Sequence, residues 1–206
     1  MCKTVAKGLN IAFLGWIAKI VLFCIALALD EGSEIREFLP WLGYLIMLFG
    51  LWTAKEGEET FGKALAGMVA FFLCEGVRIL VSEEGSSNKP TGAAMILAIF
   101  GVIASAAMVY FVCDGILRAL YYQDAPQLEK RSNTVWYLTL AYTLIYIVTI
   151  GFLALGAAGF GAFLYVLALI LNLVASVLLG LLLYSSSAYL SKVDDQAETE
   201  PEQKEP

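Results

Sequence analysis

Residues 160–184 read FGAFLYVLALILNLVASVLLGLLLY and carry no charged side chain. A helix that crosses a bilayer needs about 20 mostly apolar residues, because each residue adds about 1.5 Å and the hydrocarbon core is about 30 Å thick. This stretch is long enough to cross the core with residues to spare. The stretch therefore predicts a transmembrane helix. We interpret the rest of the chain as a membrane protein, whose solvent is lipid rather than water.

Five more apolar runs precede this stretch. The six predicted spans cover about residues 8–29, 38–54, 64–81, 92–120, 134–155 and 160–184. The first is too long for the core of a signal peptide and is expected to be retained. Pro40, near the start of the second, suits a first helical turn, where its missing N–H is not needed. Only the segment Gly156-Ala157-Ala158-Gly159 joins the last two spans, which predicts an antiparallel hairpin.

The overall composition agrees with six spans. Of the 206 residues, 60% are hydrophobic and 16% are charged, whereas soluble domains average about 45–50% apolar and about 25% charged residues. Six spans use about 120 residues, and no remaining stretch is long enough for a globular domain of about 50 residues or more. The sequence therefore predicts an all-α, polytopic membrane protein, with six transmembrane helices in a short-looped bundle within residues 1–185.

The lysine and arginine residues predict the orientation, because cytoplasmic loops collect them. Arg36 and Lys89 would lie outside, and Lys19 and Arg78 lie within spans. With the N-terminus inside, the other nine basic residues are cytoplasmic: Lys3, Lys7, Lys55, Lys63, Arg118, Lys130, Arg131, Lys192 and Lys204. We expect an N-in/C-in, multi-pass protein of the cell membrane, with the bacterial cytoplasmic membrane as its location.

Residues 186–206 form a predicted acidic cytoplasmic tail. Six acids, the first of which is Asp194, and the lysines Lys192 and Lys204 give this tail −4 of the formal net charge of −6. Such a composition buries too little apolar surface to offset the entropy of ordering, so disorder is predicted from about Asp194. The acidic balance also argues against nucleic acid as a partner and against a tail that binds anionic lipid.

Ionisable residues inside spans are costly and are the best site candidates in a membrane protein. Four qualify here: Lys19, Glu75, Arg78 and Asp114. Counted along their helices, Lys19 and Glu75 lie at nearly the same depth, about 16–18 Å from the cytoplasmic face. Two such groups should either pair or face a wet cavity. We expect them to form an ion pair, with Arg78, one turn from Glu75, either as a second partner or with its side chain extended toward the outer surface. The four-residue spacing of Asp114 and Arg118 lets their side chains meet.

Two polar faces complete the candidate intramembrane site. In the fifth span Tyr142 and Tyr146 share a helix face with Thr139 and Thr149, and the sixth span carries Tyr165, Asn172 and Ser176 in a similar stripe. Such faces turn toward other helices or toward a water-filled pathway. The pattern therefore fits either hydrogen bonds that hold helices together or the lining of a solute pathway. Small residues at positions 8, 12 and 15, followed by Lys19, predict a helix-packing seam.

The sequence lacks residues that enzymatic, metal-binding and nucleotide-binding sites usually need. The sequence contains no histidine, which removes the commonest general base and metal ligand. Cys24, Cys74 and Cys113 lie in apolar runs, and the cysteines do not have metal-binding spacing. No nucleotide-binding motif occurs. We predict no cofactor, no metal and no enzymatic activity, although a dyad of Lys19 with Ser105 or Ser176 is chemically allowed.

Two classes of function remain. The first is a small non-enzymatic binding or assembly subunit of a membrane complex, because the polar residues are few enough to satisfy one another. The second is a small solute transporter, or the membrane component of one, that uses Lys19, Glu75, Arg78 and Asp114. The expected partners are the lipid bilayer and other membrane subunits or a second copy of the chain.

Overall fold

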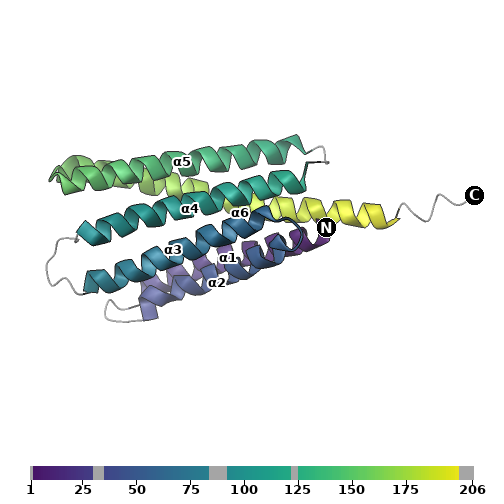
Figure 1. Cartoon of the computed structure of the whole chain (residues 1–206), viewed down its shortest axis with the longest axis horizontal. Helices are drawn as coiled ribbons and strands as arrows, with labels where there is room; N and C mark the ends of the chain where they lie inside the picture. Colours follow the sequence, from purple (N-terminus) through teal and green to yellow (C-terminus); the bar gives the residue numbers. More distant parts are fainter. Residues whose placement is uncertain (1, 30–34, 84–91, 122–124, 200–206) are drawn as a thin grey trace, which may run out of the picture.

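The computed structural model describes residues 2–29, 35–83, 92–121 and 125–199. They form six α-helices that run along one axis (Figure 1). The helices are α1 (Cys2–Ala28), α2 (Ile35–Lys55), α3 (Thr60–Glu83), α4 (Gly92–Ala119), α5 (Pro126–Ala154) and α6 (Ala158–Thr199). The described residues contain no strand, so the predicted all-α bundle of six helices is confirmed.

The helices form a closed ring in sequence order. Each helix packs against the next, and α6 returns to pack against α1. The pair α1 and α2 is in the closest contact, whereas α2 and α3 touch much less. We call the half of the bundle that holds the N-terminus, the turn between α2 and α3 and the start of α5 the terminal half. The other half, with the turn between α5 and α6, is the far half.

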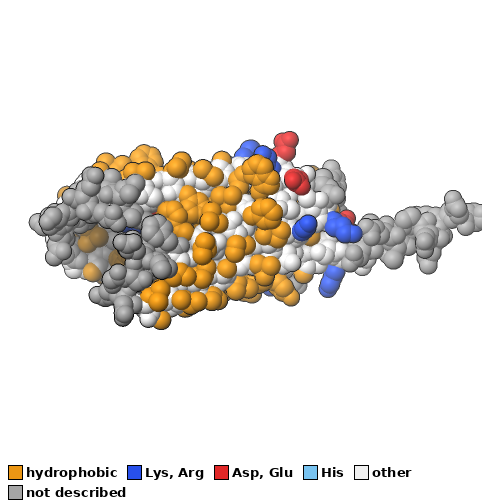
Figure 2. Space-filling model, turned by 90° about the horizontal axis from the view of Figure 1, so that it is seen from below, with side chains coloured by type: hydrophobic (Ala, Val, Ile, Leu, Met, Phe, Trp, Pro, Cys, Tyr) orange, Lys and Arg blue, Asp and Glu red, His pale blue; other side chains and the backbone are white. Residues whose placement is uncertain are grey.

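Five helices are long and apolar enough to cross a membrane, namely α1, α3, α4, α5 and α6. Apolar side chains cover the middle of the face seen in Figure 2, and the charged side chains gather toward the end from which the C-terminus projects. This distribution matches a chain whose middle lies in hydrocarbon and whose terminal end lies in water.

Local sequence explains several helix ends. A carboxylate oxygen of Glu58 accepts hydrogen bonds from the backbone N–H and the hydroxyl of Thr60, at 3.2 and 2.7 Å, and thereby caps the start of α3. Pro126 occupies the first turn of α5, where a missing N–H costs nothing. Between α5 and α6, Gly156 adopts φ +81°, a left-handed conformation that glycine reaches without strain. The predicted antiparallel hairpin is therefore confirmed.

Two details differ from the sequence-based expectation. Since α2 begins at Ile35, Pro40 lies inside the helix rather than in its first turn, because the helix extends beyond the apolar run that hydropathy detects. Helix α6 likewise continues to Thr199, so the described tail is helical past Asp194, where disorder was predicted to begin. Residues 200–206 of the predicted tail lie outside the described residues.

Packing explains the extension of α6. Leu190 is fully buried, and the Ser187 hydroxyl donates a hydrogen bond of 2.8 Å to the carbonyl oxygen of Ala6 in α1. The sequence predicted that the bundle ends at residue 185. The packed part of the chain instead extends beyond that residue. The end of α6 then projects past the N-terminus (Figure 1).

Candidate functional site

The close packing of α1 on α2 positions Lys19. A Cβ atom added at Gly43 of α2 would overlap the Lys19 backbone, and one added at Gly15 of α1 would overlap α2 at Met47. The predicted small-residue seam of α1 is thus a contact between two backbones, of the kind that lets membrane helices approach closely. The Lys19 backbone lies in this seam, and the Lys19 side chain extends away from it.

The Lys19 ammonium group meets an aromatic ring. Its Nζ atom lies 4.6 Å from the ring centroid of Tyr44 on α2, within the distance at which a ring face attracts a cation. Among the described residues, no carboxylate lies within ion-pair distance of Lys19. The expected pair of Lys19 with Glu75 is therefore not formed in this structure.

Glu75 pairs within its own helix instead. Its Oε2 atom accepts hydrogen bonds from Nη2 and Nε of Arg78, at 2.7 and 2.9 Å. The Oε1 atom turns toward Gly101 of α4, where an added Cβ would lie 3.1 Å away. The side chains of Glu75 and Arg78 are 23% and 40% exposed. The expected contact between these two residues is present, and it occupies the carboxylate that Lys19 was predicted to bind.

A small cavity lies at the centre of the ring, next to Lys19. Its volume is about 60 Å³, and five helices contribute to its wall. Its polar lining consists of Trp16, Lys19, Tyr44, Ser105, Thr139, Tyr142, Asn172 and Ser176. Four of the eight predicted site residues, Lys19, Tyr142, Asn172 and Ser176, therefore meet at one place.

Tyrosine rings extend this polar region from the cavity toward the far half. The rings of Tyr142 and Tyr146 lie 5.8 Å apart, and those of Tyr146 and Tyr165 lie 6.4 Å apart. Glu75 lies within electrostatic range of both Tyr142 and Tyr146. The pair of Glu75 and Arg78 therefore borders the same region, although neither residue lines the cavity.

Several hydroxyl groups are satisfied inside the protein. Thr139 and Thr149 donate to the carbonyl oxygens four residues earlier in α5, at 2.9 and 2.8 Å. The indole N–H of Trp16 donates to the Ser176 hydroxyl at 3.2 Å and links α1 to α6. Such bonds hold helices or satisfy single side chains, and they do not need a solute.

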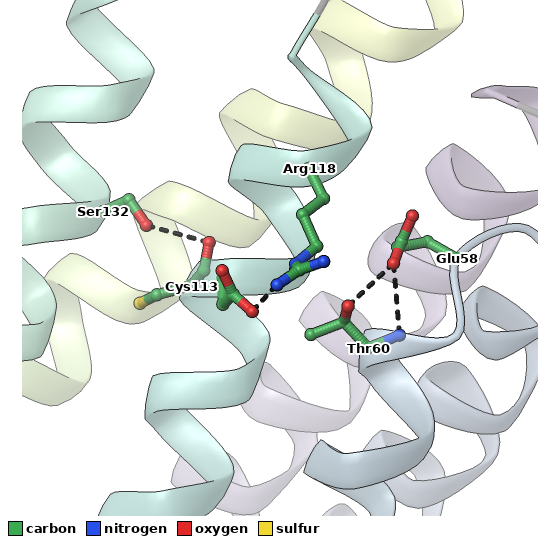
Figure 3. Close-up of polar contacts among 6 residues, drawn as sticks. Glu58, Thr60, Cys113, Arg118 and Ser132 are labelled. Carbon is green, nitrogen blue, oxygen red and sulfur yellow. Dashed lines mark hydrogen bonds and ion pairs between the residues drawn. The ribbon is translucent and has the colours of Figure 1, made fainter.

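Asp114 lies apart from the cavity, near the terminal end of α4. Its Oδ2 atom accepts a hydrogen bond of 3.0 Å from Nε of Arg118, as the four-residue spacing predicted. Figure 3 shows this pair between two other contacts: the cap of Thr60 by Glu58 and the hydrogen bond from Ser132 to the carbonyl oxygen of Cys113. Asp114 therefore belongs to the polar contacts of the terminal half.

Sequence analysis did not include Trp16 and Tyr44 in the candidate site. Trp16 lies one turn before Lys19, and Tyr44 directly follows the glycine that touches Lys19. A search for aromatic rings one turn from an intramembrane lysine would have found Trp16, but the pairing of α1 with α2 was needed to place Tyr44. Ser105 and Ser176 line the same cavity as Lys19, so the structure brings the chemically allowed dyad partners into one region.

Known proteins offer no guide to this site. No family model, no curated protein and no solved structure matches the chain. Within the described residues, no group of three or more cysteine, aspartate or glutamate side chains is arranged to hold a metal ion.

Proposed function

We propose that the protein is a small non-enzymatic binding or assembly subunit of a membrane complex. The observation that carries this proposal is the central cavity. At about 60 Å³ it is several times smaller than the roughly 300–1,000 Å³ of pockets that hold metabolite-sized ligands. Three of the polar side chains in its wall are already engaged, since Trp16 donates to Ser176 and Thr139 donates to the backbone.

Packing in the terminal half supports the same proposal. Leu9, Met68, Ile116 and Leu182 are fully buried there. A solute that passed the cavity would have to cross this layer of apolar side chains. A route through the bundle would therefore require helices to separate.

The orientation belongs to the proposal as well. Both ends of the chain are assigned to the cytoplasm, because most of the lysine and arginine residues lie on that side. The charged side chains at the terminal end in Figure 2 agree with this assignment. The proposed location is the cell membrane, and the expected membrane is the bacterial cytoplasmic membrane.

A small solute transporter is the alternative. One observation favours it, namely that Lys19 lines a cavity together with Tyr142, Asn172 and Ser176. A buried cation among hydroxyl and amide groups is a common arrangement at transport sites near the bilayer midplane.

Thiol labelling separates the two proposals. The native cysteines are replaced by alanine, and single cysteines are introduced at Thr139, Tyr142, Tyr146 and Asn172. A membrane-impermeant thiol reagent is then applied from each side separately. A binding or assembly subunit predicts that none of the four positions reacts from the terminal side, because the buried layer lies between them and that side.

Two further cysteine positions calibrate the labelling. A cysteine at the exposed Gln127 should react from the terminal side, and a cysteine at the buried Leu182 should not. Labelling of Thr139 or Tyr142 from both sides would contradict the proposal and favour transport. Mass spectrometry of gently extracted protein would then identify a protein partner, since an assembly subunit should bring one with it in constant ratio.

A further inference from the structure

The charge of Lys19 is not balanced by a contacting carboxylate. In the described part of the chain, the Lys19 ammonium group contacts the Tyr44 ring. Glu75 lies in the same region, but Arg78 engages its Oε2 atom. The other titratable side chains lining the cavity are the phenols of Tyr44 and Tyr142. The wall of the cavity therefore holds one ammonium group and no carboxylate.

Hydrogen-bond donors line the cavity beside this charge. Ser105 and Tyr142, both half-buried, contribute hydroxyl groups, and Asn172, which is exposed, contributes an amide. The Ser176 hydroxyl oxygen accepts the Trp16 N–H, so its own proton remains for another acceptor. The Thr139 hydroxyl already donates to Val135. The wall thus offers an ammonium group and several neutral donors, and it lacks a carboxylate.

The size of the cavity limits what it can hold. One water needs about 10–15 Å³ of the space that a probe can occupy, and this cavity offers about 60 Å³. That volume admits a few waters or a single small ion, whereas an amino acid or nucleotide does not fit. A positive charge within a membrane span is costly, and a bound anion offsets that cost.

We propose that the cavity beside Lys19 binds one small monovalent anion of halide size. Lys19 supplies the charge, and Tyr142, Asn172 and Ser105 supply neutral donors. This inference rests on the proposed function, because it names the ligand class of the same binding subunit.

Iodide tests the site directly, because Trp16 lines the cavity and iodide quenches tryptophan fluorescence. The full-length protein is placed in bilayers of uncharged lipid with Trp41, Trp52 and Trp136 replaced by phenylalanine, so that Trp16 is the remaining tryptophan. Iodide titrated at constant ionic strength should quench Trp16 with a saturable component. Chloride added in competition should reverse that component.

Two lysine variants identify the binding group. Lys19→Met should abolish the saturable quenching. Lys55→Met is the matched control, because the Lys55 ammonium also lies over an aromatic ring, that of Trp52 at 5.5 Å, and Lys55 does not line the cavity. Phenylalanine at position 52 keeps an aromatic ring there in the assay protein. Lys55→Met should leave the quenching of Trp16 unchanged. Asn172→Leu keeps Lys19 and should weaken iodide binding at least about tenfold, the loss expected for a hydrogen bond to a charged group.

A second readout guards against a misfolded variant. If Lys19→Met does not fold, a second measurement tests the anion site. The Tm of the parent protein and the Tm of Asn172→Leu are each measured in chloride and in gluconate. Chloride should raise the Tm of the parent and raise that of Asn172→Leu less, because a ligand stabilises the state that binds it. Non-saturable quenching together with equal Tm values in chloride and gluconate would overturn the anion site. That result would leave the proposed function standing if Thr139 stays protected from thiol reagents.

Discussion

The terminal half and the far half of the bundle are built differently. Among the described residues, eleven of the twelve largest fully buried side chains lie in the terminal half, and Thr149 is the exception. The contacts that link α1 to α6 run from Ala6 to Trp16 and do not reach the end of α1 among those described. The far half has apolar side chains facing outward and the polar region of Lys19, Glu75 and the tyrosines inside it.

This difference shows what each half depends on. Lipid is as apolar as leucine, so the hydrophobic effect does not drive helices together within the membrane. The terminal half is held by close packing and by buried hydrogen bonds, such as that from Ser132 to Cys113. The far half combines the close packing of α1 on α2 at Gly43 with ionic and aromatic contacts around polar residues. Mutations should therefore have different effects in the two halves.

The largest effect is expected from a side chain forced into the seam of α1 and α2. A Cβ at Gly50 would overlap the backbone of Ala12, whereas a Cβ at Gly151 in the far half of α5 meets nothing within 4 Å. Gly50→Leu should lower the free energy of unfolding by about 3 kcal/mol or more. Gly151→Leu should change it by less than about 0.5 kcal/mol. Unfolding by titration with a denaturing detergent measures both, and equal losses would remove the contrast between the halves.

Substitutions of charged residues should instead have their larger effect in the far half. Glu75→Leu takes away the carboxylate partner of Arg78 at membrane depth and should cost about 2.5 kcal/mol. Asp114→Leu breaks a pair in the terminal half whose Arg118 side chain is 59% exposed, and it should cost about 0.5 kcal/mol. Detergent unfolding again provides the measurement.

A double-mutant cycle tests the missing contact of Lys19 in the same assay. Lys19→Leu and Glu75→Leu should be additive within about 0.5 kcal/mol, since the two side chains do not touch. A larger coupling energy would restore the ion pair predicted from depth alone.

Truncations along α6 should give an intermediate effect. Leu182 is fully buried in the terminal half, and Leu169 in the far half is 48% exposed. Leu182→Ala should cost about 2 kcal/mol, because it leaves a cavity between packed helices. Leu169→Ala should cost less than about 0.5 kcal/mol, since lipid fills the space. A similar loss for both would mean that a partner covers the far half of α6.

The smallest expected effect separates two neighbouring serines. Ser187→Ala removes the hydrogen bond to Ala6 and should cost about 1 kcal/mol. The hydroxyl of Ser186 is buried and, within the described structure, has no hydrogen-bond partner. Ser186→Ala should therefore leave stability unchanged or raise it. The same unfolding assay distinguishes them, and a loss for Ser186→Ala would reveal a partner of its hydroxyl.

Hydropathy was sufficient to predict the helices and their order. Each of the six predicted spans coincides with a helix. The second predicted span is the exception in one respect, because α2 is not among the five described helices that are long and apolar enough to cross a membrane. The seam around Gly15 was equally readable, because small residues at helical spacing mark a close approach. The same signal could not give the full length of α6, since Leu190 and Ser187 pack against other helices in a segment whose overall composition is polar.

The pairing of charges was harder to predict. Depth gives the position of Lys19 and Glu75 along the membrane normal, but it does not give the direction in which either side chain points. Arg78 lies three residues from Glu75 on the same helix, so the two side chains are already neighbours. A contact between Glu75 and a lysine on another helix requires more groups to be ordered. Lys19 lines a cavity whose wall is contributed by five helices.

Helix α6 contains 42 residues, which corresponds to about 63 Å and twice the thickness of the hydrocarbon core. The acidic segment from Asp194 to the end of this helix is therefore a direct continuation of a membrane span. A flexible tether would uncouple the charges from the span. A continuous helix connects the acidic segment rigidly to the span. A tilt or rotation of α6 within the bilayer therefore also moves its acidic end.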